Sequence, residues 1–91
     1  MEKFKEIPNN TKKIYCRRWG CGYECCDMNY LAIWANYLDG DKLKGIELWE
    51  SKYFFTDEAN DYKEEFDEAF KFYGLEIPEN IWDYEDVERT L

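Results

Sequence analysis

The chain has 91 residues, 20% of them aromatic, and its 12 basic and 21 acidic residues give a formal net charge of −9. This length provides for one domain with a modest core, and the aromatic content excludes a disordered tail despite the charge. The acidic excess disfavours direct binding of nucleic acid, because carboxylates repel phosphates. We therefore expect a single folded domain over residues 1–91.

The pattern of polar and apolar residues in the first third of the chain predicts an arm followed by two strands. Residues 1–10 are polar and end on a Pro-Asn-Asn turn signal, which predicts a flexible arm or a short first turn. Apolar and polar side chains alternate over residues 11–19, as in a strand. Gly20 and Gly22 interrupt this pattern, and residues 23–28 are predicted to return as the second strand of a hairpin.

The clearest local signal is a hairpin over residues 31–49. Its two β-compatible runs flank Asp39-Gly40, a dipeptide that supplies positive φ in a tight turn. Gly45 lies within the second run and predicts a bulge or a close backbone approach at that point.

A helix is predicted over residues 57–73, because apolar side chains recur there every three or four residues. Thr56 is the expected N-cap, with Asn60 as a competing one. Gly74 stands where this helix should end.

A second, short helix should open at Pro78 or Glu79 and run to about Arg89. The expected fold class is therefore α+β. A small antiparallel sheet of three or four strands over residues 11–55 is followed by one main acidic helix and the short second helix.

The sequence offers little for catalysis. It has no histidine, the commonest general base, and Ser51 is its only serine. Its five glycines show none of the spacings of phosphate-binding loops. We therefore expect a binding protein without a cofactor and not an enzyme, and an enzyme built on a perturbed carboxylate is the weakest alternative.

Four cysteines, Cys16, Cys21, Cys25 and Cys26, fall within eleven residues. Four thiolates are a ligand set of structural zinc, but the gaps here do not match two C-x₂-C-like pairs. Adjacent cysteines in a strand would also point to opposite faces. We expect small apolar strand residues and no metal, with a zinc-stabilised interaction adaptor as the alternative function and disulfides as a further alternative.

The charge is distributed unevenly along the chain. Residues 1–55 hold 9 Lys/Arg and 8 Asp/Glu, whereas residues 56–91 hold 3 Lys/Arg and 13 Asp/Glu. Carboxylates at such a density repel each other, and in a helix face that serves only solubility, lysines would normally be interspersed among them. We interpret the acidic region as a surface for a basic partner; a solubilising helix face is the plainer alternative.

Carboxylates three or four residues apart on a helix stand ~5–6 Å from each other, which is comparable to the spacing of phosphates along one nucleic-acid strand. Two acidic rows on a compact body would thus imitate the two charged edges of a duplex. The predicted contact residues are Asp57, Asp61, Glu64, Glu65, Asp67, Glu68, Asp83, Glu85 and Asp86. The four at positions 64, 65, 67 and 68 are expected to contribute most.

In size, acidity and aromatic content the chain resembles the phage-encoded inhibitors of host defence, which include anti-CRISPR proteins and other DNA mimics. Residues 32–49, with the Asp39-Gly40 turn followed by Leu43, Gly45 and Trp49, also resemble the opening hairpin of ArdA-type antirestriction proteins. Those proteins begin with that hairpin, whereas residues 1–31 precede it here.

This resemblance implies a stoichiometric inhibitor that binds the basic nucleic-acid channel of a host defence nuclease complex. No apolar run of the sequence is long enough to span a bilayer, and residues 1–10 carry no signal-peptide pattern. The expected location is therefore the host-cell cytoplasm, with a basic protein surface as the partner and neither a membrane nor nucleic acid bound directly.

Overall fold

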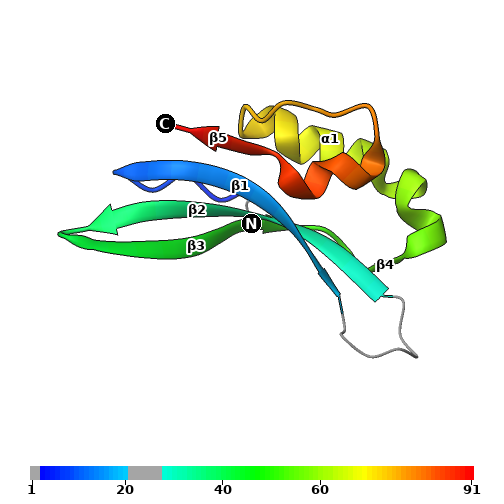
Figure 1. Ribbon diagram of the computed structural model, residues 1–91, viewed down its shortest axis with the longest axis horizontal. Helices are drawn as coiled ribbons and strands as arrows, with labels where there is room; N and C mark the ends of the chain where they lie inside the picture. The colour runs from blue at the N-terminus through cyan, green and yellow to red at the C-terminus, as the bar shows by residue number, and fades with distance from the viewer. Residues whose placement is uncertain (1–2, 21–27) are drawn as a thin grey trace.

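The computed structural model describes residues 3–20 and 28–91. These residues form an antiparallel sheet with a helical layer over one of its faces (Figure 1). The strands are β1 (Thr11–Gly20), β2 (Met28–Asp39), β3 (Lys42–Glu50), β4 (Phe54–Phe55) and β5 (Glu88–Thr90). The helical layer contains the 3-10 helix η1 (Thr56–Tyr62), the α-helix α1 (Lys63–Phe72) and the 3-10 helix η2 (Ile81–Asp86). This arrangement confirms the predicted α+β class.

The sheet has the order β3-β2-β1-β5, and β4 pairs with the beginning of β2. The predicted hairpin is confirmed, because β2 and β3 pair from their shared turn at Asp39↔Lys42 onward. Gly40 is the first of the two central turn residues and has a φ of 67°, a conformation that costs glycine no Cβ clash. The other predicted hairpin strand, residues 23–28, lies outside the described residues except for Met28, which opens β2.

A bulge does interrupt the β2–β3 ladder, but the prediction that placed it at Gly45 was wrong. Ile33 pairs with Trp49 and Trp34 with Glu47, so Leu48 is the extra residue. Leu48 is 1% exposed and Trp49 5%, so two consecutive side chains of β3 are buried in the core. A regular strand would turn one of them to the opposite face, and the bulge avoids this.

The main helix differs from its prediction at its start and agrees at its end. Its first seven residues form η1, and the position before them is Phe55, not the predicted cap Thr56. The Glu58 carboxylate accepts a hydrogen bond from the Phe55 backbone N–H at 3.0 Å, while the Thr56 hydroxyl accepts one from Asn29. Gly74 ends the helical turn with a φ of 69°, as predicted.

The predicted second helix is wrong in its C-terminal half. Only η2 is helical, with Asn80 as its cap, and Glu88–Thr90 form the strand β5 along the edge of β1. The Val87 carbonyl already accepts a hydrogen bond from the Cys16 N–H at 2.9 Å. The unpaired backbone groups at this edge therefore draw the chain into the sheet, which extends beyond residues 11–55.

The core lies between the sheet and the helical layer. Its largest fully buried side chains include Tyr73, Tyr84, Phe54, Phe66, Phe70, Ile14 and Ile33. The described part of the predicted arm, residues 3–10, packs against this body. The Lys5 N–H donates to the Leu48 carbonyl at 3.3 Å, and the Tyr73 hydroxyl donates to the Lys5 carbonyl at 2.8 Å.

Candidate partner-binding site

The exposed side of α1 is acidic because its other side is buried. Phe66, Ala69 and Phe70 are each 0% exposed and pack on the sheet. Helical periodicity then turns Glu64 and Glu68, one turn apart, toward solvent.

Two shallow hollows lie on either side of the link from α1 to η2. The first, of about 350 Å³, is lined by Glu64, Asp67, Glu68, Lys71 and Ile77. The second, of about 390 Å³, is lined by Glu76, Pro78, Asp83, Asp86, Val87 and Glu88. Ile77 lines the first hollow, and its chain neighbours Glu76 and Pro78 line the second, so the two acidic groups are neighbours. We call Glu64, Glu68, Glu76, Asp83 and Asp86 together the acidic surface.

Asp67 is bound by other residues of the fold, so it is less available to a partner than the carboxylates of the acidic surface are. Its carboxylate accepts hydrogen bonds from Lys63 at 2.8 Å and from the hydroxyl of Tyr84. Tyr84 is fully buried; burial, followed by this hydrogen bond, raises its pKa. The hydrogen bond to Asp67 is also the main reason that the pKa of Lys63 is raised. Asp67 therefore joins α1 to η2.

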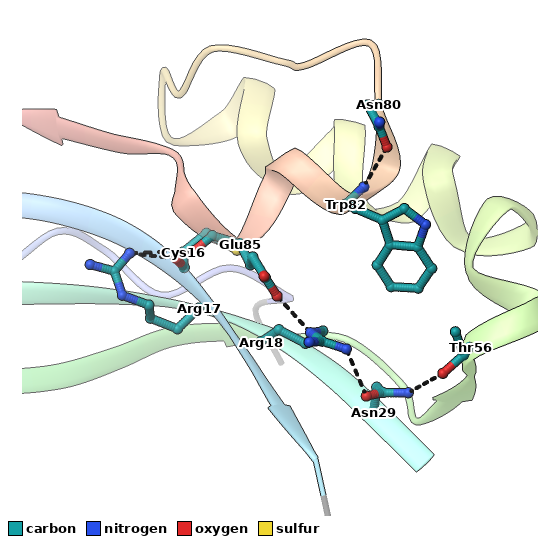
Figure 2. A network of polar contacts seen from close by, with 8 residues as sticks. All are labelled: Cys16, Arg17, Arg18, Asn29, Thr56, Asn80, Trp82 and Glu85. Atoms are coloured by element: carbon teal, nitrogen blue, oxygen red, sulfur yellow. Dashed lines mark hydrogen bonds and ion pairs between the residues drawn. The ribbon is translucent and has the colours of Figure 1, made fainter. Parts of the chain in front are cut away.

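Glu85 is likewise held within the fold, by Arg18 (Figure 2). The Arg18 Nε donates to Glu85 at 2.6 Å, and its Nη1 donates to Asn29 at 3.3 Å. The Asn29 amide in turn donates to the Thr56 hydroxyl at 3.2 Å. This chain of contacts ties β1 and β2 to both 3-10 helices, and the Arg18 guanidinium also lies 5.7 Å from the Trp82 ring centre.

The remaining predicted residues do not all lie on one surface. Glu68 pairs with Lys3 at 3.1 Å, between two well-exposed side chains. Glu65 lines a different hollow, of about 400 Å³, beside Lys3, Lys5, Glu47 and other residues of the β3 edge. Asp57 and Asp61 are exposed on η1. Neighbouring positions on a helix point about 100° apart, so Glu64 and Glu65 cannot serve one flat surface equally.

The nine predicted contact residues thus divide into two sets. Within the described residues, Asp67, Glu68 and Glu85 take part in ion pairs. No ion pair between described residues involves the other six, which are Asp57, Asp61, Glu64, Glu65, Asp83 and Asp86. Sequence reasoning did not foresee this division. The i,i+4 spacing of Lys63 and Asp67 was a usable signal, whereas nothing local links Arg18 to Glu85.

Cys16 is the one member of the cysteine cluster that the structure describes. Its side chain is 0% exposed on the helix-covered face of β1, within the core cluster. Burial raises the pKa of its thiol to about 12, so the thiol stays protonated at neutral pH and packs as a small apolar group. Cys21, Cys25 and Cys26, the other members of the alternative zinc site, lie outside the described residues.

Comparison with known proteins yields no relative. No protein-family model, no curated protein and no solved structure matches the chain. No helix within the described residues is long and apolar enough to cross a membrane.

Proposed function

We propose that the chain is a stoichiometric inhibitor of a nucleic-acid-directed defence nuclease of the host, of the anti-CRISPR kind. It acts in the host-cell cytoplasm as a binding protein without turnover. Its acidic surface occupies a basic channel that otherwise holds DNA or a guide duplex. The partner is therefore a lysine- and arginine-lined protein surface, and the inhibitor itself binds no nucleic acid.

One observation carries this proposal: carboxylates without internal partners gather on both sides of the link between α1 and η2. Glu64 lies on one side, and Asp83 and Asp86 on the other. The chain has cations to spare elsewhere, such as Lys42 and Lys52, which are exposed and join no ion pair between described residues. Crowded charges of one sign repel each other and lower the stability of the fold. Binding to a partner of opposite sign would offset this repulsion, which is a reason for the chain to keep the carboxylates together.

The physical basis of such binding is the same as for a nucleic acid. A basic channel attracts phosphates, and a surface of fixed carboxylates at similar spacing satisfies the same cations. Fixed carboxylates on a folded surface lose less conformational freedom on binding than a flexible polyanion would. Affinity of this origin falls as salt rises.

The experiment titrates the protein into reconstituted RNA-guided and restriction nucleases and follows the cleavage of labelled target DNA. The expected result, for the sensitive nuclease, is a linear loss of cleavage that is complete near one equivalent of protein and weakens at higher salt. The double variant Asp83→Lys/Asp86→Lys should weaken inhibition at least about ten-fold.

The matched control is Asp39→Lys/Asp41→Lys, which changes the net charge equally at two exposed sites at the tip of the β2–β3 hairpin. It should inhibit nearly as well as the unchanged protein. Equal potency of the two double variants would reject the site. A second pair refines the edge of the surface, because Glu64→Lys should weaken inhibition more than Glu65→Lys.

A further inference from the structure

The face of the sheet opposite the helical layer is uncovered in the described residues (Figure 1). Ile14 and Cys16 of β1 point into the core, so the alternating residues Tyr15, Arg17 and Trp19 point to the other face. On β2 the same face carries Tyr30 and Trp34, which pair with Trp19 and Tyr15 of β1. On β3 it carries Glu47 and Glu50, which pair with Trp34 and Ala32 of β2. We call these seven residues the open face.

The centre of the open face is aromatic. Tyr15 pairs with Trp34, and Trp19 with Tyr30, across β1 and β2. Trp19 is 45% exposed. The indole nitrogen of Trp34 is buried and donates to no acceptor within the described part of the chain. Among the described residues, Trp19 is therefore exposed, the rings of Tyr15, Tyr30 and Trp34 are partly exposed, and one buried indole N–H has no acceptor, which is an unusual combination for a surface.

The charges of the open face are arranged with opposite signs on either side of β2. On the β1 side, Lys13 and Arg17 share one acid, Glu88. On the β3 side, Glu47 and Glu50 lie close together. The pKa of Glu47 is raised, first by burial and then by the charge of Glu50. The β1 side therefore has two cations for one acid. On the β3 side Lys5 and Lys52 line the same hollow as the two glutamates, but neither Glu47 nor Glu50 joins an ion pair between described residues.

A surface with this arrangement is complementary to itself. A two-fold axis running along β2 between two facing copies places β1 of each copy over β3 of the other. Arg17 and Glu50 both pair with Ala32, so they lie in one row on either side of the axis. The operation therefore sets Arg17 of each copy against Glu50 of the other, with the Trp34 rings at the centre.

We propose that the open face is the interface of a homodimer, in which two sheets pack face to face through their aromatic centres and exchange Arg17–Glu50 ion pairs. Three strands of about ten residues present roughly 500 Å² of flat area per copy. Projecting aromatic side chains enlarge the accessible area toward the ~800 Å² per partner of a standard interface. A nucleic acid fits this face poorly, because Glu47 and Glu50 repel phosphates. The dimer leaves the acidic surface, on the opposite side of the sheet, free.

The test is sedimentation equilibrium over a micromolar concentration range. The expected mass rises from the 11.1 kDa of one chain to twice that value. Arg17→Glu and Glu50→Arg should each weaken self-association at least about ten-fold. An equimolar mixture of these two variants should form a heterodimer, because one ion pair is then the unchanged Arg17–Glu50 pair and the other is restored with reversed sign. Asp41→Arg, at the hairpin tip, is the control and should dimerise normally.

A chain that stays monomeric at every concentration overturns the proposal, as does a dimer that neither charge reversal weakens. Because Arg17 also contacts Glu88 and two backbone carbonyls, circular dichroism must show that Arg17→Glu is folded. Glu50→Arg removes no ion pair between described residues and decides the question if the first variant unfolds. Failure of the dimer would leave the proposed inhibition untouched, since the two surfaces share no residue.

Discussion

Glu88 and Glu47 lie on the same face of the sheet, on opposite sides of Trp34, and their ionisation is shifted in opposite directions. Lys13 lowers the pKa of Glu88, whereas burial and the neighbouring Glu50 raise the pKa of Glu47. The helical layer repeats this contrast, because Asp67 is held by internal partners and Glu64 has none among the described residues. The formal net charge therefore does not show which carboxylates hold the fold together and which remain for a partner.

The largest difference between held and unheld carboxylates is expected at Asp67 and Glu64. Asp67→Ala leaves the buried Tyr84 hydroxyl without its acceptor, which should cost about 1–3 kcal/mol of unfolding free energy. Glu64→Ala should change stability by about 0.5 kcal/mol or less. Urea unfolding monitored by tryptophan fluorescence measures both. Asp67→Asn keeps an acceptor and should lose less than Asp67→Ala; equal losses at positions 64 and 67 would contradict the contrast.

A smaller difference is expected between Glu85 and Asp83, two residues apart on η2. Glu85→Ala breaks the contact with Arg18, whose side chain is 39% exposed, so solvent screening limits the loss to about 0.5–1 kcal/mol. Asp83→Ala removes a charge from a crowded acidic hollow and should cost nothing measurable. Thermal unfolding at low and high salt separates the two, because the Glu85 effect should shrink as salt rises. A salt-independent loss at Glu85 would indicate packing and not the ion pair.

The parts of this fold that sequence could predict depend on local chemistry. Asp39-Gly40 specifies the hairpin, and Gly74 ends the helix because its φ of 69° is a conformation that a residue without a Cβ adopts easily. The strand β5 could not be predicted, since its three residues are defined by the free edge of β1 and not by their own pattern. The acidic region was recognisable as a whole. Its division was not, because Arg18 and Glu85 are 67 positions apart.

The smallest effects are expected at Glu88 and Glu47, and they should have opposite signs. A lowered pKa means that Glu88 stabilises the fold above its ordinary value of 4.5 and that this contribution is lost as the pH falls through the folded-state pKa. The raised pKa of Glu47 has the reverse consequence: its contribution to stability is complete below pH 4.5 and is lost as the pH rises through the folded-state pKa.

At neutral pH, Glu88→Gln should therefore lower the melting temperature slightly and Glu47→Gln should raise it. Well below pH 4.5 both variants should match the unchanged protein. Scans at concentrations where the chain is monomeric keep self-association out of the comparison, and shifts of the same sign at neutral pH would show that the two sides of the open face do not differ in charge as described.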